Sequence, residues 1–184
     1  MPFNRLARCM ASTTLCLIVL MLAANLAVWL FPRLGSIEGG LGLSFSLSDR
    51  MVSALGPNVT SMPWWQTLGA IMLSSLPLLV LSFGLLNLRA LFKSYAAGEY
   101  FSATTSTHMR RLGIAVALWV VLGVLCEPLL SAWATMQLPP GQRFISLSFD
   151  SSGIVALFLA GCVIVVASIL RRAHEIDSEN KHFV

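Results

Sequence analysis

The sequence predicts an all-α integral membrane protein, built as a four-helix transmembrane bundle. Of its 184 residues, 57% are hydrophobic and only 11% are charged, and the mean hydropathy is +0.80. A soluble domain is about 45–50% apolar and about 25% charged, because a surface that faces water needs ionised side chains. Four apolar stretches are also long enough to cross a bilayer. Basic residues are concentrated at the two ends of the chain and between the second and third stretches. These observations argue against a soluble enzyme, a disordered tail and a disulfide-rich scaffold.

The four predicted spans cover about residues 11–31, 67–88, 113–136 and 152–170 of a single membrane domain, 1–184. A hydrocarbon core about 30 Å thick needs roughly 20 helical residues, and each stretch meets this length. The first stretch follows two arginines, as a signal peptide does, but its apolar run is longer and ends without a small-residue cleavage site. We therefore expect the first span to be retained as an anchor.

The distribution of basic residues predicts the direction in which the chain crosses the membrane. Of the 12 Lys and Arg residues, nine lie in the N-terminus, in the linker 89–112 or in the tail 171–184. The other three, in the two remaining loops, are Arg33, Arg50 and Arg143. Because Lys and Arg are retained on the cytoplasmic side, both termini and the linker are expected there. Four tryptophans fall near the predicted outer boundary, where indole rings favour the headgroup region: Trp29, Trp64, Trp65 and Trp133.

Each of the two outer loops contains a short segment in which apolar and polar residues alternate. The segments are 41–49 (LGLSFSLSD) and 144–150 (FISLSFD). A period of two is typical of a half-buried strand, and pairing the two segments would satisfy both backbones. The sequence thus predicts a two-stranded β element, the alternative being that two serine-rich loops alternate by chance.

The second and fourth spans are expected to continue as helices beyond the membrane. Apolar residues continue at helical spacing after the second span until Gly98, a residue that favours helix termination. Ser102 is a suitable cap for a short helix over 103–111 that leads into the third span. The fourth span runs on into the polar tail, where Arg171 and Glu175 are four residues apart and can form an ion pair.

One ionisable residue, Glu127, lies inside a predicted span. Such residues are costly in a membrane and mark candidate functional sites by default. Asn25, Ser74 and Ser75 lie at similar depth in the first two spans, so the four residues form a predicted polar layer, with Asn25 as the expected partner of Glu127. Interhelical hydrogen bonds in membranes contribute about 0.6 kcal/mol on average, so we favour a structural role over a transport or sensing site.

Other chemistry has little support in the sequence. His108, His174 and His182 lack the spacing of a metal motif, and the four cysteines contain no C-x-x-C pair, so we expect them to be buried small hydrophobic residues. No catalytic, cofactor-binding or metal-binding motif is present, and we expect no enzyme activity and no cofactor. The net charge of +4 is explained by membrane orientation, and direct binding of nucleic acid is not expected.

The linker and the tail resemble a known bacterial family. The segments NLRALFKSYAAGEYFS and MRRLG and the terminal AHEIDSENKHFV are similar to the membrane protein family called domain of unknown function 2975. The matching positions are Leu88, Leu91, Phe92, Gly98, Phe101, Gly113, Glu179, Asn180 and Val184. The resemblance implies a small protein of the bacterial inner membrane without established catalysis. Members often occur beside a gene for a small helix-turn-helix regulator, which implies a membrane partner or sensor.

Two hypotheses for function follow. The leading one is a polytopic membrane protein without catalysis that acts with a cytoplasmic helix-turn-helix regulator. Its predicted contact residues in the tail are Glu175, Glu179, Asn180 and Val184. The alternative is a small transporter or channel component, a homo-oligomer in the bilayer that uses Glu127 as its ionisable site.

Overall fold

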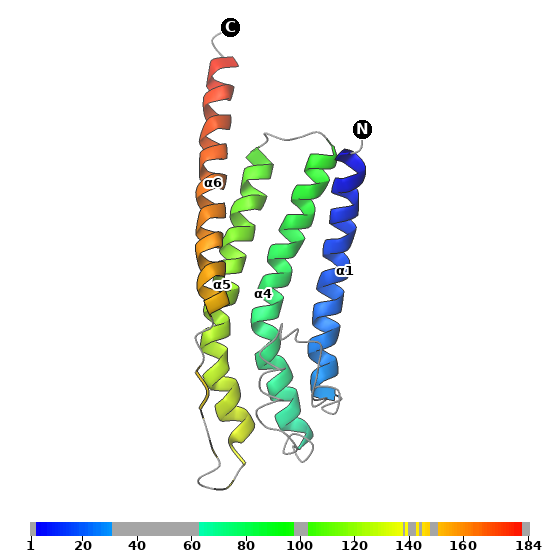
Figure 1. The fold of residues 1–184 in the computed structure, drawn as a ribbon, viewed down its shortest axis with the longest axis vertical. Coiled ribbons are helices and arrows are strands. Elements are labelled where there is room, and N and C mark those ends of the chain that lie inside the picture. Colours follow the sequence, from blue (N-terminus) through cyan, green and yellow to red (C-terminus); the bar gives the residue numbers. More distant parts are fainter. Residues whose placement is uncertain are drawn as a thin grey trace. The chain divides into compact units, whose positions relative to one another are not determined.

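The protein is all-α in the part of the chain that the structure describes. This computed structural model describes residues 3–30, 63–97, 103–137, 139, 143, 145–147 and 151–181. Four helices make up most of them: α1 (Phe3–Leu30), α4 (Trp64–Ala96), α5 (Ala103–Thr135) and α6 (Ser151–Lys181) (Figure 1). Each helix contains a stretch long and apolar enough to cross a membrane. The prediction of four helices that are able to span a membrane is therefore confirmed.

The helices are longer than the predicted spans. α4 ends at Ala96, beyond the predicted boundary at 88, and α6 continues from the apolar stretch to Lys181. The helix predicted over 103–111 is not a separate element, because α5 runs unbroken from Ala103 to Thr135. No proline interrupts this segment before Pro128, and α5 continues through Pro128 as well. Gly98 and Ser102 lie outside the described residues.

The predicted β element is not shown. Residues 145–147 of the second predicted strand are described, and they are neither strand nor helix. The first predicted strand, 41–49, lies outside the described residues.

The chain divides into two compact units, and α1, α4 and α5 each contribute to both. Unit 1 comprises Met1–Ile18, Val80–Val120 and Asp150–Val184, and therefore contains all of α6. Unit 2 comprises Val19–Leu79 and Val121–Phe149. The packing is described below within each unit.

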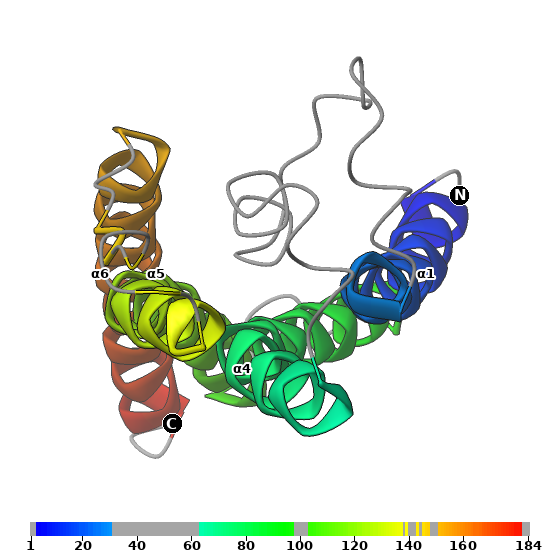
Figure 2. The same cartoon turned by 90° about the horizontal axis from the view of Figure 1, so that it is seen from below.

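In unit 1 small residues allow the helices to approach closely. α5 lies between α4 and α6 in both views (Figures 1 and 2). A Cβ atom added at Gly113 of α5 would lie 2.7 Å from Cγ1 of Ile164 and 3.0 Å from the carbonyl oxygen of Ala160, both on α6. Small residues at such positions are what packing between membrane helices requires, since lipid supplies no hydrophobic driving force for association.

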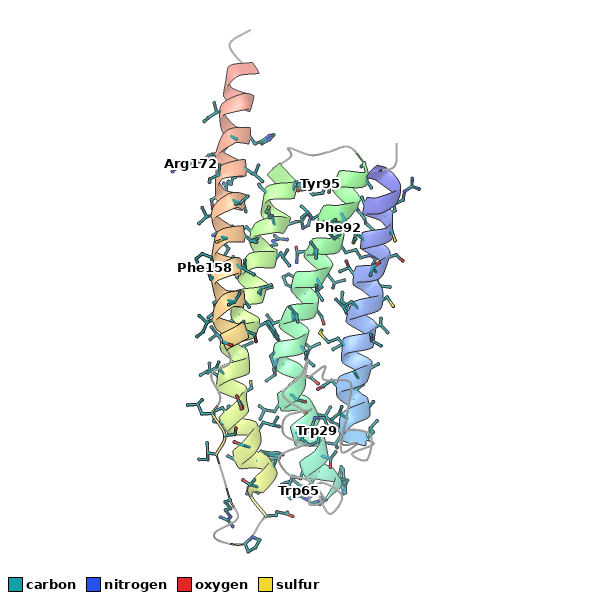
Figure 3. All side chains as sticks on the ribbon, in the orientation of Figure 1. Trp29, Trp65, Phe92, Tyr95, Phe158 and Arg172 are labelled. Carbon is teal, nitrogen blue, oxygen red and sulfur yellow. The ribbon has the colours of Figure 1, made fainter. Side chains whose placement is uncertain are left out.

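Unit 2 has a compact core where α4 lies between α1 and α5 (Figures 1 and 2). The buried residues of this core are Trp29, Ala70, Leu130 and Ala134. Trp133 packs against it, and its ring is perpendicular to that of Trp65, with 5.8 Å between the ring centroids. Figure 3 labels Trp29 and Trp65, which lie on α1 and α4.

Large apolar side chains also cover the outside of the helices. Val19, Met72 and Phe158 are 60%, 75% and 71% exposed, as expected for surfaces that face lipid. Three of the four cysteines also lie on this outer surface. Cys126 is buried, but Cys9, Cys16 and Cys162 are exposed. The expectation that all four are buried is therefore wrong. Hydropathy cannot separate a core-facing side chain from a lipid-facing one, because both surroundings are apolar.

Candidate functional site

Polar side chains join α1 to α4 inside unit 2. Nδ2 of Asn25 donates a hydrogen bond to the Ser75 hydroxyl at 3.1 Å, and Nε1 of Trp29 donates to the Ser74 hydroxyl at 3.2 Å. Both serines donate in turn to the carbonyl oxygen of Ile71. Asn25 and Trp29 are four residues apart and therefore lie on one face of α1. Asn25, Trp29 and Ser74 are almost completely buried, so this group links the two helices in an apolar environment.

Glu127 belongs to a second group, formed with the segment that follows α5. The hydroxyl of Ser146 donates to Oε1 of Glu127 at 3.0 Å, and the backbone amide of Ser146 donates to the Ser131 hydroxyl at 3.0 Å. The Ser131 hydroxyl in turn donates to the carbonyl oxygen of Pro128 at 3.0 Å. We refer to Glu127, Ser131 and Ser146 as the Ser146 clasp. It holds a residue outside the helix against two side chains that are one helical turn apart.

In the described part of the alternating segment, the polar residue faces α5 and its apolar neighbours are exposed. Ser146 is half-buried, whereas its neighbours Ile145 and Leu147 are 73% and 56% exposed. Glu127 and Ser131 lie within the candidate membrane span Thr104–Thr135. Backbone without helical hydrogen bonds is tolerated at apolar depth only where protein or water satisfies its polar groups. The clasp supplies one such partner, the Ser131 hydroxyl, to the amide of Ser146.

A third polar contact joins the ends of α4 and α5. Gln66, in the first turn of α4, is only 1% exposed. Its Nε2 donates to the carbonyl oxygens of Trp133 at 2.8 Å and Ala134 at 3.0 Å, and Nε1 of Trp133 donates back to the Gln66 carbonyl oxygen at 3.0 Å. Carbonyls in the last turn of a helix lack the usual partner within that helix. Gln66 supplies a donor to two of them, and the Trp133 carbonyl oxygen also accepts from the backbone amide of Met136 at 3.4 Å.

One polar contact in unit 1 joins α4 to α5. Nδ1 of His108 lies 3.0 Å from Oδ1 of Asn87, whose Nδ2 donates to the carbonyl oxygen of Phe83 at 2.9 Å. Asn87 is buried, with 6% of its surface exposed. The pair therefore fixes α5 against α4 near the linker that connects them.

The structure rearranges the predicted polar layer. It brings Asn25, Ser74 and Ser75 together as expected, but it places Glu127 in the Ser146 clasp. The Glu127 carboxyl group accepts a hydrogen bond from Ser146, and Asn25 donates one to Ser75. Asn25 and Glu127 lie in different helices at similar predicted depth, but depth alone does not determine which faces of two helices meet.

Four residues that the sequence analysis did not assign to the polar layer complete these groups: Trp29, Gln66, Ser131 and Ser146. Ser131 could have been found, since it follows Glu127 by four residues and therefore shares its helix face. Ser146 lies in the alternating segment 144–150, but the sequence analysis paired this segment with segment 41–49 and not with α5. Gln66 carried no signal of its own, because it was placed at the end of a loop.

The chemistry available to these groups is hydrogen bonding. Among the described side chains, no three of His, Cys, Asp and Glu lie together as a metal site would require. Within the Ser146 clasp, one carboxyl group and two hydroxyl groups meet, without a histidine or lysine among the clasp residues to activate a serine.

The predicted contact residues of the tail lie on or beyond the end of α6. Glu175 is exposed and accepts a hydrogen bond from Nε of Arg171 at 3.0 Å, which confirms the predicted ion pair. Glu179 and Asn180 are in the last turns of α6, where only the backbone is described. Val184 lies outside the described residues.

A family model matches the region that contains the Ser146 clasp. It is described as "Protein of unknown function (DUF2975)", and it covers residues 49–184, most of the chain. The chain belongs to this family. The resemblance inferred from the linker and the tail is therefore confirmed. The DUF2975 region includes α4, α5 and α6, whereas α1 and its Asn25 precede it. No curated protein and no solved structure matches the chain.

Proposed function

We propose that this DUF2975 protein is a membrane-embedded partner or sensor that acts with a cytoplasmic regulator and has no catalytic activity of its own. The observation that carries the proposal is the continuity of α6. This helix runs without a break from the apolar stretch into the charged tail and ends at Lys181. Residues 171–181 extend it by about 16 Å, at 1.5 Å per residue. A rigid connection of this kind transmits a movement of the membrane segment to the tail.

The proposed orientation places the α6 extension in the cytoplasm of a bacterial cell, with the protein in the inner membrane. It rests on the excess of Lys and Arg in the N-terminus, the linker and the tail. Within unit 1, α6 continues past the beginning of α5 (Figure 1). The extension is therefore accessible to a soluble protein.

The surface of the extension supports a protein contact. Arg171, Arg172 and Glu175 are exposed, and Ile176 is 60% exposed among them. A protein interface has an apolar centre and a polar rim, and Ile176 with its charged neighbours offers both on one surface. We propose that a small helix-turn-helix regulator binds here, using Glu175 and, further along the tail, Glu179, Asn180 and Val184.

Site-specific crosslinking tests this proposal. A photoreactive residue at position 176 is expected to crosslink one soluble DNA-binding protein in living cells. The same residue at position 165, where Val165 is exposed on the apolar part of α6, is the matched control and is expected to give no such product. Removal of residues 173–184 should change transcript levels in the same way as deletion of the whole gene. Transcript levels that stay at wild type after truncation would refute the role of the tail.

The transporter alternative draws on Glu127, and the geometry gives it less support. The Glu127 side chain is 4% exposed and accepts a hydrogen bond from Ser146, so the carboxyl group has a structural partner. A transport site needs a path by which an ion or substrate reaches the carboxyl group. We therefore keep the regulator partnership as the proposed function.

A further inference from the structure

Unit 1 contains a groove between α5 and α6 where the apolar part of α6 ends. Its volume is about 410 Å³, and its lining includes Arg110 of α5 and Arg171, Arg172 and Glu175 of α6. Arg172 is labelled on α6 in Figure 3. The lining therefore combines basic residues from two helices that are far apart in the sequence.

The groove carries an excess of positive charge. Among the side chains that the structure describes, three arginines line it against one carboxylate, Glu175, and Arg171 already pairs with that carboxylate at 3.0 Å. Arg110 and Arg172 are exposed, and neither forms a hydrogen bond or an ion pair with another residue that the structure describes. Among the described residues, these two guanidinium groups are therefore the ones available to bind an anion.

The chemistry of the lining favours a phosphate group. Guanidinium groups donate two parallel hydrogen bonds to phosphate oxygens and bind them more specifically than a point charge does. The groove also lies beside the beginning of α5 at Ala103, since Ser106 and Thr107 from its first turns line it. The positive end of the helix dipole adds to the attraction for an anion at this place.

The surface next to the groove is apolar. Such a surface favours a lipid over a soluble phosphate compound, because a lipid also has acyl chains to bury. Ile164 lines the groove itself, and Val165 and Ile169 on the same helix are 59% and 60% exposed. On α5, Ile114 and Leu118 follow Arg110 at intervals of four residues and are 46% and 45% exposed. A lipid whose phosphate binds the arginines can therefore place its acyl chains along the apolar surfaces of both helices.

We propose that this groove binds the headgroup phosphate of an anionic phospholipid through Arg110 and Arg172. Basic pockets between membrane helices at the cytoplasmic side are suited to such headgroups, because anionic lipids are abundant in that leaflet. Arg171 pairs with Glu175 and so keeps this carboxylate from competing with the lipid phosphate. The acyl chains pack against the exposed apolar residues of α5 and α6.

Titration of phosphatidylglycerol into the full-length protein in neutral detergent, followed by native mass spectrometry, tests the proposal. Arg110→Gln and Arg172→Gln are each expected to weaken binding about five-fold, since one basic residue near a membrane surface contributes about this much. The matched control is Arg111→Gln, which removes the same charge from the next position, an exposed residue outside the lining of the groove. We expect this variant to bind as the wild type does.

Two further arms separate the lipid from other sources of phosphate and from a general charge effect. Phosphatidylcholine should bind weakly to all variants, and inorganic phosphate should not displace phosphatidylglycerol. Binding of inorganic phosphate as tight as that of the lipid would overturn the assignment to a lipid. Equal weakening by Arg110→Gln and Arg111→Gln would overturn the groove itself, provided that circular dichroism shows both variants folded.

Discussion

The hydroxyl of Ser146 donates a hydrogen bond to Oε1 of Glu127, 3.0 Å away, from a segment that lies outside any helix. This contact holds the segment that follows α5 against the side of α5. Because Glu127 is only 4% exposed, its carboxyl group has little access to solvent and depends on partners within the protein. A buried polar group that loses its partner costs about 1–3 kcal/mol. Ser146 is therefore a determinant of how this segment is held.

Replacement of Ser146 by alanine should destabilise the protein through the Ser146 clasp. We expect Ser146→Ala to lower the free energy of unfolding by about 1–3 kcal/mol, because it leaves the buried Glu127 carboxyl group without this donor. Equilibrium unfolding in mixed detergent micelles measures this change. Ser168→Ala is a suitable control, because Ser168 is exposed and donates only within its own helix, to Ile164. Equal effects of the two substitutions would show that the clasp contributes nothing specific.

Substitutions at Glu127 distinguish a structural role from a protonation site. Glu127→Gln keeps a side-chain oxygen that accepts the Ser146 hydrogen bond, so we expect stability and cellular phenotype close to wild type. Glu127→Leu removes the acceptor and should cost about 1–2 kcal/mol, the upper range for hydrogen bonds in membranes. Unfolding measurements and the transcript assay together provide the test. A stable Glu127→Gln protein without function would contradict the structural role.

A double-mutant cycle checks the assignment of Glu127 to the clasp. The losses from Glu127→Leu and Ser146→Ala should not add, because both remove the same hydrogen bond. The losses from Glu127→Leu and Asn25→Leu should add, because Asn25 donates to Ser75 in a separate group. If Glu127→Leu were coupled to Asn25→Leu and not to Ser146→Ala, Asn25 would be the partner of Glu127, as their similar depth predicts.

Depth and hydropathy were enough to predict the four helices but not their contacts. A span must be apolar along its whole length, so its existence is visible in composition. A contact between two spans also depends on the rotation of each helix about its axis. Asn25 illustrates this, since its face of α1 meets Ser75 of α4. In a membrane protein the apolar faces that contact lipid hide this rotation, as the exposed cysteines show.

The loop after α5 shows a different limit of sequence analysis. Its alternation predicted a half-buried strand, but among the described residues the apolar Ile145 and Leu147 are exposed and the polar Ser146 is half-buried. The period of two did not identify the partner of Ser146, which is α5, through Glu127 and Ser131. A side-chain acceptor such as Ser131 satisfies a backbone amide as well as a neighbouring strand does.

The contact between α4 and α5 in unit 2 should depend on Gln66. Gln66→Leu preserves volume but leaves the carbonyl oxygens of Trp133 and Ala134 without this donor. We expect a loss of about 1–3 kcal/mol in the free energy of unfolding, the cost of unpaired buried groups. Gln137→Leu, at an exposed position just after α5, is the matched control and should change stability little. A silent Gln66→Leu would mean that other groups satisfy these carbonyls.

The close approach of α5 and α6 in unit 1 can be tested with a pair of glycines on one helix. A Cβ atom at Gly113 would lie 2.7 Å from Ile164 and 3.0 Å from the Ala160 carbonyl oxygen, which belongs to a backbone that cannot easily move. At Gly123 the same atom would meet nothing within 4 Å. We expect Gly113→Ala to destabilise the protein by about 1–3 kcal/mol, as overpacking does. Gly123→Ala should be neutral or stabilising, since alanine favours a helix by about 0.8–1.0 kcal/mol over glycine. Equilibrium unfolding of both variants provides the comparison, and equal stabilisation by the two alanines would show that α6 does not pack against Gly113.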